Sequence, residues 1–415
     1  MDPDRASRRA TARGPVSDRM AVVDMPIIPT IAALVREVPG TISLGQGVVH
    51  YPPPASALRA VGALADDPLL HRYQSVFGCA PLLEALIDKL AAENGIVAAP
   101  GGSGIAPGGS AVMVTAGSNS ALLAAIMAVG DPGDEFILPT PYFFNHEMAV
   151  RMCNGTPVPV PTRADWQLDL AAIEAAITPR TRAIITVSPN NPTGAVYAPE
   201  DLAAVNALCG ARGLYHFSDE AYEYFVYGGA RHFSPGSLPG AAAHTLSFYT
   251  FSKAFGMASW RVGYVVYPAA LGDALSKVQD TNLICAPVAS QYAALAAMRQ
   301  GRDWLAPRLA SLAAVREQVL DELRALDGLA RVPRTEGGFY LMVELPGLGD
   351  ADPMAFNEAM VRQHQVATIP GFAFGLSDAR SANYQRLSYG ALDAASVRQG
   401  VERFVRAVRH WYRRA

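Results

Sequence analysis

Stretches rich in β-branched and aromatic residues alternate with alanine-rich stretches through the middle of this chain. Strand-like segments are expected at residues 111–117, 134–141, 156–160, 181–189, 214–222 and 244–253. Helix-like segments lie between them at residues 120–130, 170–177 and 199–213. This alternation is typical of a mostly parallel sheet with flanking helices, because a parallel connection is long enough to hold a helix. The sequence therefore predicts an α/β fold, with the proline-containing segment "TPVPV" (156–160) at an edge of the sheet.

The sequence changes character after about residue 300. A charged helical stretch at 307–326 precedes three strand-like segments, and an amphipathic helix at 394–413 closes the chain. The three strand-like segments lie at 337–345, 366–371 and 384–390. With 415 residues, the chain is long enough for two domains with cores of their own. We therefore expect a second, smaller α+β domain.

Charge and cysteine content narrow the class of protein. The formal net charge is −3, which favours neither nucleic acid nor an anionic membrane as a partner. The four cysteines lie far apart and the eight histidines lack metal-ligand spacing, so we expect reduced thiols, no metal site and a cytoplasmic location. The longest candidate for a membrane span, residues 283–298, is shorter than the ~20 apolar residues required and contains Ser and Gln, which favours a buried helix. Residues 1–20 contain arginines but no apolar core, which predicts a flexible tail rather than a secretory signal.

One lysine stands out in the stretch "SFYTFSKAFGMASWRVGY" (247–264). Lys253 lies among small, hydroxylated and aromatic residues, where a buried ammonium group is costly unless it is paired, deprotonated or used covalently. A desolvated lysine is well suited to form a Schiff base with an aldehyde. The aldehyde cofactor pyridoxal 5'-phosphate would also need an anion at its ring nitrogen, donors at its phenolic oxygen, an aromatic ring at its face and a cationic phosphate site.

The chain offers each of these groups where a predicted strand ends. "SDEAY" supplies Asp219 for the ring nitrogen and Tyr222 for the phenolic oxygen, and "SPNNPTG" supplies Asn191 for the same oxygen. "TPYFFNH" supplies Phe143 for stacking. The groups expected at the phosphate are Gly117, Ser118 and Asn119 of "TAGSNSAL", and Thr250, Ser252 and Arg261. Ligands of α/β sheets collect beyond the carboxyl ends of the strands, which is where these residues are expected to lie.

Alone, each of these residues has an ordinary structural explanation, such as a helix cap, a turn, a core aromatic or a surface ion pair. The glycine-rich stretch 98–110 also lacks the GxxxxGK[ST] spacing, which favours a flexible surface loop over a phosphate site. The order of four motifs carries more information than any single residue. They are "NPTG", "SDEAY", "TFSKAFGMASWRVGY" and "YQRLSYG".

With these motifs, residues 25–410 resemble a fold-type I pyridoxal-phosphate enzyme of the class I/II aminotransferase family. The resemblance implies a large domain with a mostly parallel seven-stranded sheet (56–299) and a smaller α+β domain that closes on substrate (21–55 and 300–415). It also implies that Lys253 is the Schiff-base lysine and proton carrier of a ping-pong transamination between an α-amino acid and a 2-oxo acid.

The resemblance assigns further residues to the site. Tyr73, in "HRYQSVFG", matches the tyrosine that reaches the cofactor phosphate of the partner subunit, which implies a homodimer with shared active sites. Arg386 matches the arginine that binds the substrate α-carboxylate through two prongs. Gly47 matches the glycine where the N-terminal segment closes over substrate, and Asn191 also lies on the substrate side.

Two stretches bear on the substrate. "LGQGVVHYPPP" has Val49-His50 where the commoner family pattern has Pro-Asp, and with "QDTNLICAPVASQ" it resembles plant methionine and aromatic aminotransferases. Residues 279–285, where aspartate-specific members carry an arginine, contain neither arginine nor lysine. We therefore expect a neutral apolar substrate, with Tyr51, Tyr142 and Phe143 as an apolar wall. The alternative is that an arginine from another segment, Arg36 or Arg151, enters the substrate pocket.

Two other hypotheses about the function compete with transamination. The same cofactor motifs would serve β- or γ-elimination or replacement, a cyclase acting on an S-adenosylmethionine-like substrate, or an oxidase. A cofactor-sensing transcription regulator would need an N-terminal DNA-binding module of some 60 residues, and the resemblance begins near residue 25. An aminotransferase is the leading hypothesis.

Overall fold

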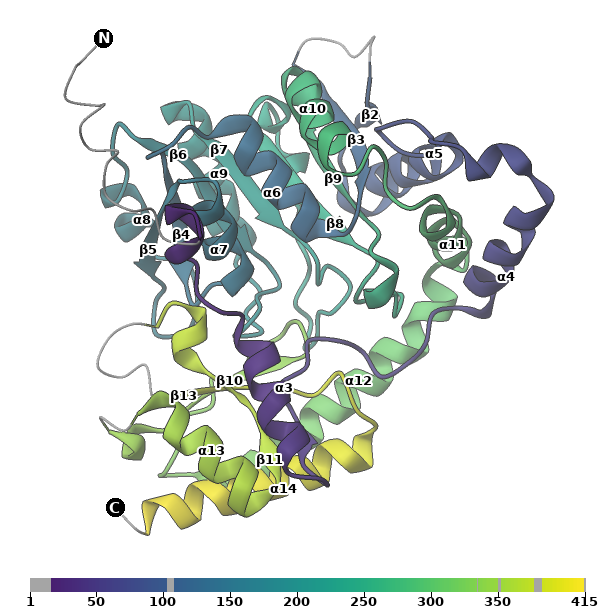
Figure 1. Ribbon diagram of the computed structural model, residues 1–415. Coiled ribbons are helices and arrows are strands. Elements are labelled where there is room, and N and C mark those ends of the chain that lie inside the picture. The colour runs from purple at the N-terminus through teal and green to yellow at the C-terminus, as the bar shows by residue number, and fades with distance from the viewer. Residues whose placement is uncertain (1–15, 103–107, 334, 350–351, 377–382, 414–415) are drawn as a thin grey trace.

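The computed structural model describes residues 16–102, 108–333, 335–349, 352–376 and 383–413 (Figure 1). Most of the tail predicted at 1–20 therefore lies outside the described residues, and its last part enters the short helix α2 (Asp18–Ala21). The glycine-rich loop predicted at 98–110 also lies partly outside them, at 103–107.

Eight strands form the large sheet, in the order β2-β3-β9-β8-β7-β6-β4-β5. They are β2 (Ala98–Pro100), β3 (Ser110–Thr115), β4 (Glu135–Thr140), β5 (Thr156–Pro161), β6 (Thr181–Val187), β7 (Tyr215–Asp219), β8 (Thr245–Thr250) and β9 (Gly263–Pro268). All pairs are parallel except the two that β9 makes with β3 and β8. The sheet has one strand more than the seven predicted, because the short β2 pairs with β3. The proline-rich β5 occupies an edge, as predicted.

Helices cover both faces of this sheet. They are α5 (Ala80–Lys89), α6 (Ser118–Val129), α7 (Phe144–Met152), α8 (Leu170–Ala175), α9 (Pro199–Arg212), α10 (Gly272–Asn282) and α11 (Val288–Met298), with α4 (Ala55–Ala63) packed on α11. Figure 1 shows α6 lying across the sheet. Along β3, Ala111 and Met113 pack in the cluster that contains α6, whereas Val112 and Val114 pack on the opposite side. Burial on both faces explains why these strands are almost continuously apolar.

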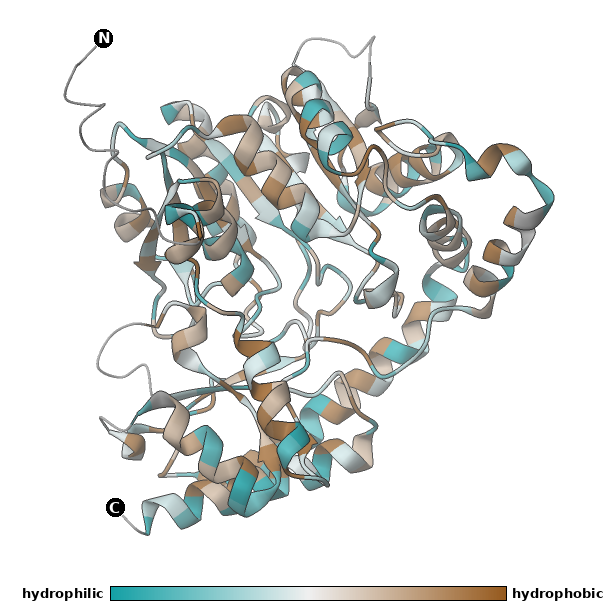
Figure 2. Ribbon diagram, in the orientation of Figure 1, coloured by the Kyte–Doolittle hydropathy of each residue, from teal (hydrophilic) through white to brown (hydrophobic). Residues whose placement is uncertain are grey.

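A second, smaller group of strands and helices lies mainly in the chain after the long helix α12 (Gly301–Leu323) and includes residues 27–43 from the beginning of the chain. Its antiparallel sheet has the order β10-β13-β12, and β1 pairs with β11 beside it. The bounds are β1 (Ile42–Ser43), β10 (Tyr340–Glu344), β11 (Val366–Ala367), β12 (Ile369–Pro370), β13 (Tyr384–Ser388), α3 (Ile27–Glu37), α13 (Pro353–His364) and α14 (Ala394–Tyr412). Hydrophobic and hydrophilic residues alternate along α14 (Figure 2), and Val397, Val401, Phe404 and Val408 form its buried stripe.

Four parallel strands of the large sheet bring their carboxyl ends to one edge. β4, β6, β7 and β8 end at Thr140, Val187, Asp219 and Thr250, and the loops that follow carry most of the predicted site residues. Among the helices of the described residues, none combines the length and hydrophobicity needed to cross a lipid bilayer.

Candidate active site

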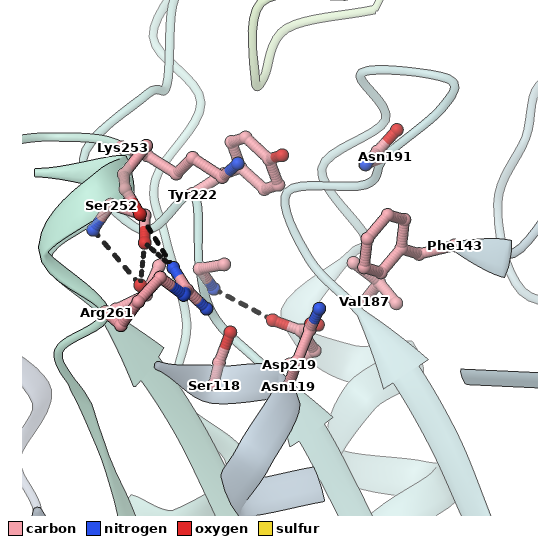
Figure 3. A pocket seen from close by; sticks show the side chains of 13 residues that line it. Ser118, Asn119, Phe143, Val187, Asn191, Asp219, Tyr222, Ser252, Lys253 and Arg261 are labelled. Atoms are coloured by element: carbon pink, nitrogen blue, oxygen red, sulfur yellow. Dashed lines mark hydrogen bonds between the residues drawn. The ribbon is translucent and has the colours of Figure 1, made fainter. Parts of the chain in front are cut away.

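A cavity lies at this edge of the large sheet (Figure 3). Its walls are formed by Ser118, Asn119, Phe143, Val187, Asn191, Asp219, Ala221, Tyr222, Thr250, Ser252, Lys253, Ala258 and Arg261. Ten of these thirteen are residues that the sequence predicts for the site. Val187, Ala221 and Ala258 were not predicted, and each is a small or apolar neighbour of a predicted polar residue.

Lys253 reaches the cavity from the turn after β8. Its Nζ donates a hydrogen bond to the Gly47 carbonyl at 2.7 Å and lies 5.7 Å from the centre of the Tyr222 ring. Burial lowers the pKa of Lys253 to about 8, and the positive charges of Arg386 and Arg261 act in the same direction. About a tenth of this amine is therefore uncharged at pH 7, far more than for an ordinary lysine, and a nucleophile or a proton acceptor must be uncharged.

Asp219 ends β7 and presents its carboxylate to the same cavity. One oxygen, Oδ1, accepts the Ala221 N–H at 3.1 Å, and Oδ2 lies 2.9 Å from His146 Nε2. His146 is 2% exposed and belongs to α7, where the Phe143 ring contacts it edge-on at 5.4 Å. His146 was not predicted as a site residue, although it follows Phe143 by three residues in "TPYFFNH", a spacing that puts both on one face of a helix.

The other end of the cavity is built to hold an anion. Gly117 precedes α6 with a φ of +82°, and a Cβ added there would lie 2.4 Å from Arg261 Nη2. The N-terminus of α6 thus offers free N–H groups beside a guanidinium. Thr250 Oγ1 donates to Ser252 Oγ at 2.8 Å, and Arg261 Nη1 donates to the same Ser252 oxygen at 3.4 Å (Figure 3). The N–H groups of the α6 N-terminus, the hydroxyls of Thr250 and Ser252 and the guanidinium of Arg261 thus lie close together, as the binding of a phosphate would require.

Arg386 approaches from the small sheet, in the middle of β13. Its Nη1 donates to Asn191 Oδ1 at 2.8 Å and its Nη2 to the Gly45 carbonyl at 2.6 Å. The side chain is 1% exposed, and its Nε lacks a hydrogen-bond partner among the described residues. The rings of Tyr340 and Phe374 lie 4.6 and 5.0 Å from its guanidinium carbon. A buried guanidinium with a free donor is suited to a carboxylate ligand.

Tyr222 is joined to a residue that the sequence analysis did not assign. Its hydroxyl lies 2.7 Å from that of Tyr340, which is the first residue of β10. Burial raises the pKa of Tyr222 well above its ordinary value, so the hydroxyl keeps its hydrogen. The only sequence signal was the position of Tyr340 in "GGFYLMVEL", where an aromatic residue in a buried strand is more simply explained by packing.

Three aromatic residues of the sequence analysis lie elsewhere. Tyr73 does not line the cavity of the single chain, and its side chain is 80% exposed. Tyr142 lines a different cavity, beside Phe372. Tyr51 packs against Trp304, with its hydroxyl on the Ala254 carbonyl. Of the proposed apolar wall, only Phe143 faces this cavity.

The two arginines left open by the sequence are also accounted for. Arg151 pairs with Glu147 within α7, and Arg36 is exposed near the end of α3. Neither lines the cavity.

Comparisons with known proteins agree with this arrangement. A family model described as aminotransferase class I and II matches residues 39–404. An aromatic aminotransferase of Arabidopsis thaliana is 34% identical, with 94% of this chain and 97% of the relative covered. An aspartate aminotransferase of Rhizobium meliloti is also 34% identical, with 91% of each chain covered. The solved structure of Thermus thermophilus aspartate aminotransferase with maleate has a TM-score of 0.84 at 31% identity and covers 95% of this chain and 100% of its own.

The fold and its relatives define an enzyme with the aspartate-aminotransferase-like architecture, which uses pyridoxal 5'-phosphate. More narrowly, the chain belongs to the class I and II aminotransferases, the family whose model spans most of its length. It is a transaminase, and its substrates are an amino acid and a 2-oxo acid. The relatives carry aminotransferase names, so the elimination, cyclase and oxidase alternatives are not favoured.

The cavity has the groups that this cofactor demands. An amine with a depressed pKa, a buried carboxylate and an anion site of hydroxyls, helix N–H groups and a guanidinium surround one space. Gly117 has a φ of +82°, and a Cβ there would meet the Arg261 guanidinium, so a residue with a side chain would disturb the position of Arg261. These residues could hold pyridoxal 5'-phosphate with its phosphate at α6 and its ring toward Asp219.

Proposed function

We propose that Lys253 binds the cofactor aldehyde through Nζ and, once released by the incoming amino acid, carries the proton between the two carbons of the transamination. When bound, pyridoxal 5'-phosphate supplies the carbon that takes up the amino group and a ring that accepts electron density. The observation that carries the proposal is the position of Lys253. Its amine has a pKa of about 8 and shares one cavity with the carboxylate of Asp219.

The groups around the ring divide the remaining work. Asp219 holds a negative charge at the ring nitrogen, and its bond to His146 fixes the carboxylate in that direction. With the cofactor bound, Tyr222 and Asn191 would donate to the phenolic oxygen, and Phe143 would cover one face of the ring. The phosphate would be held by Gly117, Ser118, Asn119, Thr250, Ser252 and Arg261. Because these groups are fixed before the cofactor arrives, their orientation costs little at the moment of reaction.

Arg386 is the group we assign to the α-carboxylate of the substrate. Its two outer nitrogens already donate to oxygens, those of Asn191 and Gly45, and its Nε is unpaired. A carboxylate can replace or join these acceptors in a two-pronged geometry that lysine cannot reproduce. Gly47 and Asn191 complete the substrate side, with the Gly47 carbonyl already bound to Lys253.

For the amino donor we propose a neutral apolar or aromatic amino acid. No cationic residue other than Lys253 and Arg261 lines the cavity within the described part of the chain. An unpaired substrate carboxylate buried there would lose several kcal/mol of solvation free energy. The aromatic aminotransferase relative supports this class, and the aspartate aminotransferase relative defines the competing one.

We expect methionine or phenylalanine to react faster than aspartate in the first half-reaction. Stopped-flow loss of the cofactor absorbance gives the rate for each amino acid without a 2-oxo acid acceptor, and keto-acid analysis identifies the product. Alanine serves as the control for a substrate with little side chain. If aspartate outpaces both methionine and phenylalanine, the apolar-substrate proposal is wrong while the transaminase assignment stands.

We further propose a homodimer in which Tyr73 completes the phosphate site of the partner subunit. Tyr73 is far more exposed than an aromatic residue usually is, and the exposed Leu69 lies four residues before it. Apolar side chains exposed together commonly mark a protein interface. A shared site would explain why Tyr73 is absent from the cavity of its own chain.

Co-expression of two inactive chains tests the shared site. If Tyr73 serves the partner, mixed dimers of Tyr73→Ala and Lys253→Ala keep one intact site of two, and equal expression should restore about a quarter of wild-type activity. The matched control is co-expression of Lys253→Ala with Asp219→Asn, which leaves no intact site in any dimer. Isolated mixed dimers without activity, or a monomer in solution, would rule out the shared site.

We also propose boundaries for two domains and a cellular location for the protein. We propose that residues 21–55 and 300–415 form the small domain, which closes on substrate, and that 56–299 form the large cofactor-binding domain. The position of Arg386 on the small sheet, with its bond to Asn191 of the large domain, supports closure across this cavity. Four cysteines without disulfide bonds support a cytoplasmic protein.

A further inference from the structure

Tyr340 touches both halves of the active site through different parts of one side chain. Its hydroxyl meets the Tyr222 hydroxyl at 2.7 Å, and its ring lies 4.6 Å from the guanidinium carbon of Arg386. Tyr222 belongs to the loop after β7 of the large sheet. Tyr340 lies on β10 of the small sheet, diagonal to Arg386 on the neighbouring strand β13, where the residues directly opposite are Tyr340 and Ser388, and Met342 and Arg386. Tyr340 therefore joins the proposed cofactor site to the proposed substrate site.

The surroundings of Tyr340 leave its hydroxyl little freedom. Both tyrosines are buried, and their rings meet edge to face at 5.5 Å. Gly47 packs so closely that an added Cβ would lie 2.7 Å from Tyr340 Oη. Among the described residues, Tyr222 is the hydrogen-bond partner of this hydroxyl and no other is found. Either hydroxyl can be the donor of this bond, and Tyr222 is the acceptor available among the described residues when Tyr340 donates.

We propose that Tyr340 is a positioning residue of the transamination: its hydroxyl donates to Tyr222 Oη, and its ring supports the guanidinium of Arg386. The inference rests on the proposed function of Tyr222 and Arg386. A hydroxyl has one hydrogen, so Tyr222 can serve the phenolic oxygen of the cofactor only if it accepts from Tyr340. Accepting that bond also polarises the Tyr222 O–H group and strengthens it as a donor.

The two functions of Tyr340 can be separated by substitution. Tyr340→Phe removes the hydroxyl and keeps the ring beneath Arg386, whereas Tyr340→Leu removes both. The hydroxyl should influence the cofactor, because it acts through Tyr222. The ring should influence substrate affinity, because a flat aromatic surface restrains a guanidinium that must meet a carboxylate.

The pH titration of the cofactor absorbance in the holoenzyme is the main test of the hydroxyl. Weaker donation from Tyr222 makes the bound cofactor hold its proton more strongly, so the titration midpoint of Tyr340→Phe should rise by about half a pH unit. The kcat of this variant should fall several-fold with KM for the amino acid nearly unchanged. Tyr340→Leu should show the same midpoint shift and a raised KM in addition.

Further variants separate this role from packing and from the function of Tyr222. Tyr389→Phe removes another buried hydroxyl of the small domain, one that donates to the Gly338 carbonyl, and should leave the midpoint unchanged. Tyr222→Phe should shift the midpoint more than Tyr340→Phe, and adding Tyr340→Phe to it should have no further effect.

Each outcome has a separate meaning. A midpoint that shifts in Tyr222→Phe but not in folded Tyr340→Phe or Tyr340→Leu would overturn the positioning role alone. An unshifted midpoint in Tyr222→Phe would overturn the proposed function of Tyr222 itself. Additive shifts in the double variant would show that Tyr340 acts by a route other than Tyr222. Thermal unfolding of each variant identifies a loss that comes from misfolding.

Discussion

Replacing Lys253 with alanine should abolish turnover while leaving the fold intact. The side chain makes one hydrogen bond, to the Gly47 carbonyl, and lines a cavity rather than a packed core, so its removal costs little stability. Without the amine, the cofactor loses its covalent attachment and the proton carrier is gone, which should remove essentially all of the rate that nucleophilic and acid–base catalysis provide. Activity, cofactor absorbance and thermal unfolding measure the three effects.

The chain offers a clean control for this experiment. It contains three lysines, and besides Lys253 these are Lys89, paired with Glu223, and Lys277, exposed on α10. Borohydride treatment of the holoenzyme should therefore fix the cofactor to the peptide with Lys253. Lys277→Ala should keep both attachment and activity. Attachment that persists in Lys253→Ala would show that another group reacts with the aldehyde.

The depressed pKa of Lys253 gives the same prediction a pH dependence. An amine reacts when it is uncharged, so the rate at which cofactor-free protein captures the cofactor should rise with pH and level off above about 8. An ordinary lysine, with its pKa near 10.4, would show a rate still rising well beyond that pH. A profile of the ordinary kind would contradict the environment that the structure gives Lys253.

Most of the residues that line the cavity could be predicted from the sequence, because the order of strands and helices already places them close together. Asn191 follows the predicted strand 181–189, and Asp219 and Lys253 lie in the last residues of the predicted strands 214–222 and 244–253. Parallel strands bring their carboxyl ends to one edge of a sheet. Once the strands are recognised, proximity of these residues needs no knowledge of side-chain packing. The helix start at Ser118 is found in the same way, because β3 runs directly into α6.

The residues that sequence reasoning missed depend on packing between distant segments. His146 meets Asp219 across 73 residues, and Tyr340 meets Tyr222 across 118. In the sequence, a histidine on a helix and an aromatic residue in a strand are most simply explained as surface or core residues. Tyr142 shows the converse error, because its neighbour Phe143 faces the cavity while Tyr142 points to another one.

Exchanging Asp219 for asparagine should cost roughly 2–4 kcal/mol of transition-state stabilisation, or a fall in kcat/KM of about 30- to 1000-fold. The two side chains have similar volume, and the amide oxygen can still accept the Ala221 N–H, so the loop after β7 should keep its shape. The negative charge is what disappears. Without it the ring nitrogen holds its proton less firmly, and the ring becomes a poorer acceptor of electron density. Single-turnover rates with an amino acid measure the loss.

Two further experiments distinguish the loss of charge from a general disturbance. Asp393→Asn makes the same change at the N-cap of α14, where asparagine caps as well as aspartate, and should leave kcat/KM within about twofold of wild type. A cofactor methylated at the ring nitrogen has a permanent positive charge and no longer depends on a carboxylate to keep a proton there. It should restore part of the rate to Asp219→Asn and none to Lys253→Ala. Near wild-type kcat/KM in Asp219→Asn with the natural cofactor would show that the carboxylate of Asp219, although buried beside His146, does not act on the ring.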